Sequence, residues 1–317
     1  LISGVQYTIT VTPQWTGTTF SEGYSVWIDY DKDGNFTTAE RVMNIAPTQN
    51  TTVSATFTVP LSISIGNTRM RVAMQYNATP PACDTNGYNY GEVEDYTINL
   101  FNGLVFSSNV WTPSAPTGAT SSTNILIEDG TYNVNSAISV NNITVNSGAT
   151  INVDKSQSVT VAGNITNNGE FVLNSDSNEF SSLMLSGAAT GNINYNRHVN
   201  SNAGGNDLIA PPVSGQSFVD FLSNNSNILS NTGQTQYLFG NFEKPTNDYL
   251  LFANNEAVNL EAGKGYRVAS TDNGTFTFSG AVSTGNVNVA IEKTGSNYDK
   301  WNLIGNPYTS YIKLEDF

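Results

Sequence analysis

A short repeat in the middle of the chain constrains its fold more than any other feature. Three similar segments follow one another, each with two or three apolar runs separated by Asn and Gly. They are AISVNNITVNSGATINV from Ala137, QSVTVAGNITNNGEFVL from Gln157 and SSLMLSGAATGNINY from Ser181. Equivalent positions recur every 21 or 22 residues: Ile138 and Val159, Ile143 and Ile165, and the series Gly148, Gly169 and Gly191. A period of about 20 residues built from strands alone is typical of a β-solenoid.

We therefore predict a short β-solenoid over residues 123–200. A single coil would leave its Ile, Val and Leu side chains bare on one edge, and stacking of the coils buries them. Asn at the corners tolerates left-handed backbone angles at low cost. The alternative is an ordinary sandwich with hairpins that happen to be similar, and we favour the solenoid over it.

Residues 1–102 show a different pattern, in which apolar and polar residues alternate between turns of Gly, Pro and Asn. The alternating residues are Val5, Tyr7, Ile9 and Val11; Tyr24, Val26 and Ile28; Val53, Ala55, Phe57 and Val59; Met70, Val72 and Met74; and Tyr96, Ile98 and Leu100. Such alternation gives each strand one buried face and one wet face. It predicts an antiparallel β-sandwich.

The remaining segments complete an all-β plan. Residues 103–122 are rich in Pro, Gly, Ser and Thr, and we predict a linker or an entry loop there. Residues 201–317 predict a β-rich domain, which we expect to be incomplete, with strands that include NVNVAIEK at 286–293. One helix is predicted from Ser217, because Ser217 suits an N-cap and Phe218, Phe221 and Leu222 share a face.

Charge excludes some classes of partner. The chain has 12 Lys and Arg against 26 Asp and Glu, for a net charge of −14. A field of this sign repels nucleic acid, and no basic run is present in the sequence. No apolar run reaches the ~18 residues of a membrane-spanning helix. Cys83 is the only cysteine, so the chain has no internal disulfide.

Two passages resemble segments of known families. GEVEDYTINL, at Gly91–Leu100, comes after WIDYDKDGNF and TRMRVAM. This combination is similar to the GEVED domain, which recurs in large secreted bacterial proteins and brings no catalytic activity to carry over. WNLIGNPYTSYI, from Trp301, is similar to a segment of proteins exported by the type IX secretion system. The resemblance implies a secreted or cell-surface protein, such as a modular adhesin or a carrier of enzyme domains.

The sharpest chemical signal is an acidic loop at residues 29–40. Asp29, Asp31, Asp33, Gly34 and Glu40 match the spacing of a calcium loop at every specified position. Calcium takes about 6–8 oxygen ligands, and alternate residues of a tight loop can direct carboxylates at one centre.

The flanking alternation places this loop between two strands instead of two helices. The expected ligands are Asp29, Asp31, Asp33, the carbonyl of Asn35 and Glu40. Of these we favour the three aspartates, because between two strands Glu40 can turn away from the ion. The alternative is a solvated Asp-Gly turn of a hairpin. If calcium binds, we expect an affinity of about 10⁻⁴–10⁻³ M, as in extracellular modules.

Other polar residues give weaker signals. Glu92 and Glu94 share one face of a strand and Asp95 takes the other. They could add oxygens to the same ion or pair with Arg69 and Arg71. We favour a structural role, in which they cap the start of the strand by accepting backbone hydrogen bonds. His198 is the only histidine, and no nucleophile motif accompanies it. We therefore expect no catalytic residue and no enzyme activity.

These observations predict a non-catalytic segment of a secreted, adhesin-like surface protein exported by the type IX system. Its partners would be an extracellular glycan or surface protein, or the secretion machinery that carries it as cargo. The alternative is a carbohydrate-binding accessory region of a secreted polysaccharide-degrading enzyme. A hydrolase site on the solenoid ranks third, because about three coils offer little groove.

Overall fold

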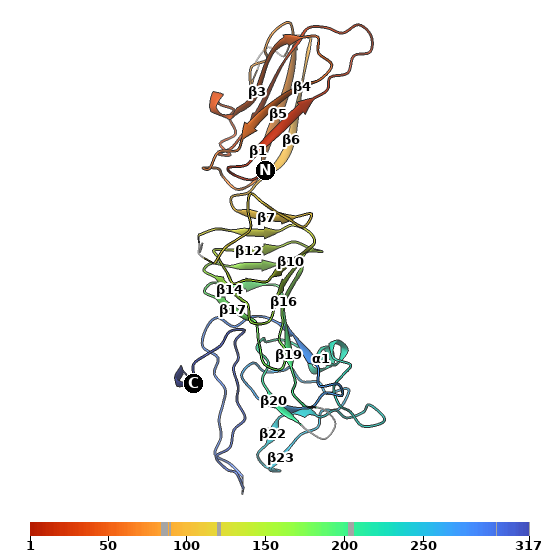
Figure 1. Ribbon diagram of the computed structural model, residues 1–317, viewed down its shortest axis with the longest axis vertical. Helices are drawn as coiled ribbons and strands as arrows, with labels where there is room; N and C mark the ends of the chain where they lie inside the picture. The colour runs from red at the N-terminus through yellow and green to blue at the C-terminus, as the bar shows by residue number, and fades with distance from the viewer. Residues whose placement is uncertain (84–87, 89, 119–121, 202–205, 296, 317) are drawn as a thin grey trace. The chain divides into compact units, whose positions relative to one another are not determined.

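The computed structural model describes residues 1–83, 88, 90–118, 122–201, 206–295 and 297–316. It is almost entirely β, with 43% strand and 4% helix, which confirms the predicted class. The chain forms two compact units (Figure 1). The first unit comprises Leu1–Leu104 with Thr112–Ser114, and the second comprises Val105–Trp111 with Ala115–Phe317.

The first unit is the predicted antiparallel sandwich. One sheet has the order β3-β2-β5-β6 and the other pairs β1 with β4. Their bounds are β1 Gln6–Val11, β2 Glu22–Ile28, β3 Arg41–Thr48, β4 Val53–Thr58, β5 Gly66–Tyr76 and β6 Gly91–Leu100. The alternating apolar residues meet between the sheets, where Tyr24, Val26, Ile28 and Leu100 are at most 1% exposed.

Strand β2 departs from the predicted alternation, because all seven of its residues are buried. Its outer face is covered by the segment that follows β5. The Ser25 hydroxyl donates a hydrogen bond of 3.1 Å to the carbonyl of Pro80. A Cβ on Gly23 would come within 2.2 Å of the carbonyl oxygen of Ala78, so only glycine fits there. A covering loop leaves no periodic signal in the strand it covers.

The second unit begins with the predicted solenoid, which has about four turns. Three parallel sheets form its faces, in the orders β10-β13-β16-β19, β11-β14-β17 and β18-β15-β12-β9. The strand bounds are β9 Ile125–Ile127, β10 Thr131–Val134, β11 Ile138–Val140, β12 Ile143–Val145, β13 Thr150–Val153, β14 Ser158–Val161, β15 Ile165–Asn167, β16 Glu170–Leu173, β17 Ser182–Leu185, β18 Ala189–Thr190 and β19 Ile193–His198. Residues at equivalent positions of the sequence repeat pair with each other in neighbouring strands: Ile138 pairs with Val159, and Ile143 pairs with Ile165.

Asparagine side chains stack into a ladder along one face of the solenoid. Nδ2 of Asn152 donates to Oδ1 of Asn133 at 2.8 Å, Asn174 donates to Asn152 at 2.7 Å, and Asn196 donates to Asn174 at 2.9 Å. An Asn side chain has both a donor and an acceptor, so Asn residues on successive coils can hydrogen-bond to one another. The ladder gives the abundant Asn of this region a structural role.

The stretch 103–122 contains two strands, β7 Leu104–Ser107 and β8 Val110–Thr112. They extend the sheet that contains β9. Phe106, Trp111 and Tyr132 pack together at the start of the solenoid, with ring centroids 4.7–5.4 Å apart. The segment predicted as a linker or an entry loop thus supplies two aromatic rings, Phe106 and Trp111, that pack against Tyr132 of the first coil.

The rest of the second unit follows the solenoid and joins one of its sheets through a single strand. Strand β25, Thr275–Gly280, pairs antiparallel with β19 and prolongs its sheet. Helix α1 covers Phe218–Asn224, and Ser217 caps it as predicted by accepting from the backbone N–H of Asp220 at 3.0 Å. Short strands complete this part: β20 Asp207–Ile209, β21 Phe239–Gly240, β22 Phe242–Glu243, β23 Asp248–Tyr249 and β24 Tyr266–Val268. Residues 286–293, predicted as a strand, form none. The backbone N–H of Glu292 donates to the side chain of Asn302 instead of to a neighbouring strand.

The segment WNLIGNPYTSYI packs against the solenoid. The backbone N–H of Leu183 donates to the carbonyl of Thr309 at 2.8 Å, and the Thr309 hydroxyl returns a bond of 3.1 Å to Leu183. The N–H of Gly265 donates to Leu303 at 3.0 Å. This segment therefore joins strand β17 to the neighbourhood of β24. Among the described residues, none of the helices is long and apolar enough to cross a membrane.

Candidate functional site

The acidic loop connects β2 to β3, as the strand pattern on both sides predicted. Asp29 directly follows β2, and Glu40 ends the short 3₁₀ helix η1, Thr38–Glu40, which leads into β3. Gly34 has φ 84°, a left-handed conformation that glycine adopts without steric cost, and it forms the sharp turn of the loop. The loop therefore brings the ends of two neighbouring strands together.

Three carboxylates of the loop converge. Asp29, Asp31 and Glu40 each offer an oxygen, and these oxygens lie within 4.8 Å of one another. Asp29 and Glu40 are buried, with 6% and 5% exposed, and Asp31 is exposed. Oδ2 of Asp29 accepts from the N–H of Gly34 at 3.2 Å. Oδ1 of Asp29 is buried and has no hydrogen-bond partner among the described residues.

Glu40 also holds the loop closed. Its Oε1 accepts from the N–H of Tyr30 at 2.9 Å. Its Oε2 accepts from the N–H of Thr37 at 2.8 Å and from the Thr37 hydroxyl at 2.9 Å. A carboxylate oxygen has about two acceptor sites, so these bonds leave Glu40 room for a cation. The sequence had left open a position for Glu40 away from the loop, and the structure places it beside Asp29.

The fourth predicted carboxylate, that of Asp33, lies outside this group. Oδ1 of Asp33 accepts from the N–H of Asn35 at 2.7 Å, and its Oδ2 accepts from the Asn35 amide at 3.2 Å. These bonds lower the pKa of Asp33 below its usual range. The Asp33 carboxylate therefore stabilises the turn with Asn35 and is not among the convergent carboxylates. The backbone carbonyl of Asn35 stays a predicted ligand.

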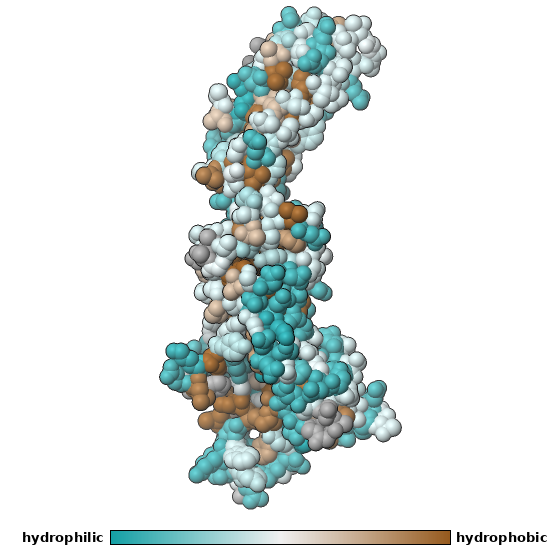
Figure 2. All heavy atoms as spheres, in the orientation of Figure 1, coloured by the Kyte–Doolittle hydropathy of each residue, from teal (hydrophilic) through white to brown (hydrophobic). Residues whose placement is uncertain are grey.

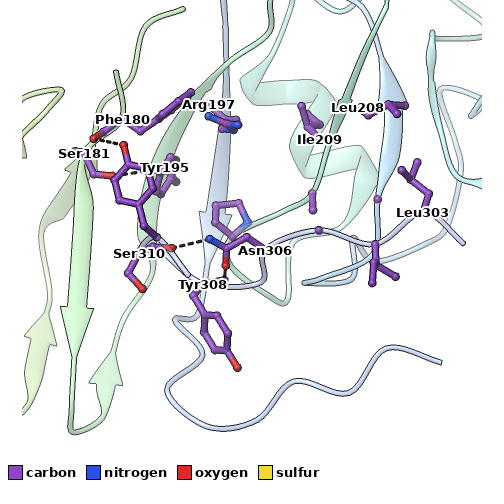
Figure 3. A pocket seen from close by; sticks show the side chains of 16 residues that line it. Phe180, Ser181, Tyr195, Arg197, Leu208, Ile209, Leu303, Asn306, Tyr308 and Ser310 are labelled. Carbon is purple, nitrogen blue, oxygen red and sulfur yellow. Dashed lines mark hydrogen bonds between the residues drawn. The ribbon is translucent and has the colours of Figure 1, made fainter. Parts of the chain in front are cut away.

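A pocket of about 270 Å³ lies in the second unit, where the solenoid meets the C-terminal segments. Figure 3 shows Phe180, Ser181, Tyr195 and Arg197 along one side and Leu208 and Leu303 on the other. In Figure 2 apolar residues gather on the visible face of the second unit below the solenoid coils. The pocket thus combines apolar walls with a cationic side chain.

Two polar groups in this pocket have unused binding capacity. The Arg197 guanidinium lies 3.9 Å from the centroid of the Phe180 ring, and no described carboxylate forms an ion pair with it. The hydroxyl of Ser181 is buried and lacks a hydrogen-bond partner among the described residues. Burial raises the pKa of Tyr195 to about 12, so its hydroxyl stays neutral while donating to the Ser181 carbonyl at 3.0 Å.

Comparison with known families places both units. Residues 106–317 match a family described as a domain of unknown function, DUF8693. The chain belongs to the DUF8693 family. Residues 23–99 match the GEVED domain, which confirms the resemblance predicted for that part. No curated protein matches the chain, and no solved structure does either. The DUF8693 match spans the solenoid, the pocket and the segments beyond it.

The acids of the GEVED motif divide between two roles. Asp95 receives two hydrogen bonds of 2.7 Å from Arg71, and Nε of Arg69 lies 3.7 Å from it. The bonds from Arg71 lower the pKa of Asp95. Glu92 and Glu94 take the opposite face and are exposed. None of the three carboxylates belongs to the convergent group of Asp29, Asp31 and Glu40. Of the roles considered for Asp95, the structure shows the pairing with arginine.

Two other residues that stood out in the sequence, His198 and Cys83, belong to neither the acidic group nor the Arg197 pocket. His198 is half-buried at the end of β19, and no nucleophile or acid pairs with it among the described residues. Cys83 is a free, exposed thiol 3.6 Å from the Arg71 guanidinium. Sequence reasoning missed the Arg197 pocket, because its residues come from distant segments that share no spacing.

Proposed function

We propose that this DUF8693 chain is a non-catalytic modular segment of a secreted or cell-surface bacterial protein, and that calcium stiffens its GEVED domain. The observation that carries the calcium proposal is the Asp29 carboxylate. Its Oδ1 is buried beside oxygens of Asp31 and Glu40, and no described residue donates a hydrogen bond to it. A buried carboxylate oxygen without a donor is costly, and a cation relieves that cost.

The chemistry of the group fits calcium better than a transition metal. All the convergent donors are carboxylate oxygens, and calcium prefers oxygen ligands. The one histidine and one cysteine of the chain lie outside the group, so no nitrogen or sulfur ligand is at hand for zinc. Three carboxylates supply fewer than the ~6–8 oxygens that calcium takes, so water fills the remaining positions. This incomplete set supports weak binding, with a Kd of about 10⁻⁴–10⁻³ M.

The proposed ion would act on stability and not on chemistry. It would link the end of β2 to the start of β3, because Asp29 and Glu40 stand at those two points. Binding to the folded state alone raises stability by about 1.4 kcal/mol when free calcium is ten times the Kd.

Isothermal calorimetry on the full chain tests this proposal, with Asp29→Asn and Asp33→Asn as matched variants. We expect saturable calcium binding in the parent chain and in D33N, and its loss in D29N. Melting temperatures should rise with millimolar calcium in the same two proteins. If none of the three releases heat or gains stability, the calcium proposal is wrong. Loss in D33N alone would restore the ligand set that the spacing suggested.

The surface role rests on the module content. A GEVED domain and a rigid solenoid suit a scaffold that holds binding surfaces away from a cell. The segment from Trp301 supports export by the type IX system. Comparing the location of the parent protein in cells with and without that system tests this route. Equal export from both would contradict it.

A second candidate is the carbohydrate-binding accessory role, which the Arg197 pocket favours. An unpaired arginine beside aromatic rings suits a sugar that carries a carboxylate. This role is tested by comparing the binding of the parent chain and of the Arg197→Ala variant to an array of acidic glycans. The role predicts binding that R197A loses and no release of reducing sugar. Release of sugar by the parent chain would instead indicate an enzyme.

A further inference from the structure

A second pocket lies in the first unit, at the end of β2 opposite to Asp29. It has a volume of about 300 Å³ and is lined by Phe20, Glu22, Tyr76 and Tyr90. Glu22 and Tyr76 are cross-strand partners at the ends of β2 and β5. The N–H of Tyr76 donates to the carbonyl of Tyr90 at 3.1 Å, next to the first residue of β6. Strand register therefore assembles the four residues at one site.

Three aromatic rings form the walls of this pocket. The rings of Phe20 and Tyr76 are 6.0 Å apart at 88°, and those of Tyr76 and Tyr90 are 6.3 Å apart at 85°. All three side chains are exposed, with Tyr90 at 87%. Exposed aromatic side chains grouped around one hollow present electron-rich faces, which attract a cation.

The floor of the pocket carries an acid, Glu22, that has no partner in the described part of the chain. Glu22 is 4% exposed, and its buried Oε2 accepts no hydrogen bond from any described residue. No described Lys or Arg forms an ion pair with Glu22. Burial raises the pKa of this carboxyl. A buried carboxylate with no partner is unfavourable, and a cation held by the rings would supply the missing charge.

The acids of the GEVED motif lie on the same face of the sheet. Glu92 and Glu94 sit opposite Met74 and Val72 in the β5–β6 register, and those two residues pack against the core. Since paired residues share a face, Glu92 and Glu94 lie on the Glu22 side of the sheet. They line a neighbouring hollow of about 260 Å³. The surroundings of the aromatic pocket are therefore negative.

We propose that this pocket binds an organic ammonium group, with Glu22 as its counter-ion and the rings of Phe20, Tyr76 and Tyr90 as cation–π partners. A neutral sugar would leave Glu22 unpaired. A calcium ion would find a single carboxylate and no use for the aromatic walls. The site is separate from the acidic loop, since the seven residues of β2 span about 20 Å between them.

Nuclear magnetic resonance titration of the full chain in EDTA tests the proposal with small probes. The probes are tetramethylammonium, butylammonium as a lysine side-chain analogue, and neutral 3,3-dimethylbutanol as an uncharged match. We expect saturable shifts at Tyr76 and Tyr90 with at least one ammonium probe and none with the alcohol. Stronger binding of butylammonium would point to lysine side chains, and stronger binding of tetramethylammonium to quaternary ammonium ligands.

Variants separate the site from general effects. Glu22→Gln should weaken ammonium binding about 10-fold or more, as expected when a charge-assisted contact is lost. Its melting temperature should stay equal or rise, because the buried charge is gone. Tyr90→Asn removes a ring from an exposed position with φ 50°, which Asn tolerates, and should weaken binding several-fold. Glu170→Gln in the solenoid and Asp29→Asn should bind as the parent does.

Equal binding of the alcohol, or binding unchanged in both E22Q and Y90N, would overturn the proposal. So would the absence of shifts with both ammonium probes. The D29N control keeps this outcome independent of the calcium proposal, because it removes the loop site and leaves the aromatic pocket intact.

Discussion

A carboxylate oxygen of Asp29 lies within 4.8 Å of a carboxylate oxygen of Glu40. The two residues are eleven positions apart in the sequence, and both are buried. Two like charges at this distance repel each other strongly in a buried setting. Glu40 offsets part of this cost by accepting three hydrogen bonds, while Oδ1 of Asp29 has none from the described residues. A cation bound between these two carboxylates would therefore stabilise the first unit.

Replacing Glu40 by alanine should destabilise the first unit even without calcium. The change removes the acceptor for the N–H groups of Tyr30 and Thr37 and for the Thr37 hydroxyl. We expect a loss of about 2–3 kcal/mol in the free energy of unfolding, measured by urea denaturation in EDTA. Asp31→Ala, which removes an exposed carboxylate of the same group, should cost less than about 1 kcal/mol under these conditions. Equal losses would mean that Glu40 does not hold the loop.

Asp95 predicts an acid-dependent loss of stability. Arg71 lowers its folded-state pKa, so the pair stabilises the fold fully above the unfolded-state pKa of about 3.9. The stabilisation disappears as the pH falls through the lower, folded value. Asp95→Asn should cost about 1 kcal/mol at neutral pH, since Asp95 is partly exposed, and progressively less as the pH falls below about 3.9. A difference between parent and variant that does not change with pH would contradict this pairing.

The asparagine ladder predicts a cost confined to the second unit. Asn152→Ala leaves Oδ1 of Asn133 without its donor and removes one acceptor of Asn174. We expect a loss of about 1–2 kcal/mol by urea unfolding. Asn178→Ala, at an exposed corner beside the same coils, should be neutral within about 0.5 kcal/mol. Hydrogen exchange should quicken around β13 and β16 and stay unchanged in the first unit.

The sequence predicted the features that depend on regular spacing. The solenoid follows from its period because each repeated pair, such as Ile143 and Ile165, becomes a pair of stacked neighbours. Alternation likewise predicted the sandwich strands. The outer face of β2 escaped this reasoning, because its cover comes from a loop near Pro80 that leaves no mark in the strand.

Site geometry was predicted less completely. The spacing of the loop found Asp29, Asp31 and Glu40 but also included Asp33, whose carboxylate takes up the N–H of Asn35 in a local turn. Spacing fixes which residues can converge, and local hydrogen bonds decide which of them do. The pocket of Glu22 and Tyr90 depends on the β2–β5 register and on the start of β6, which bring together residues 68 positions apart.

A crystal structure of the full chain grown with millimolar calcium tests the proposed metal site most directly. We predict an ion bound to Oδ1 of Asp29, to Asp31 and to Glu40, with calcium–oxygen distances of about 2.3–2.6 Å and water in the remaining positions. A loop with only water beside these three carboxylates, or an ion held by Asp33 in their place, would contradict it.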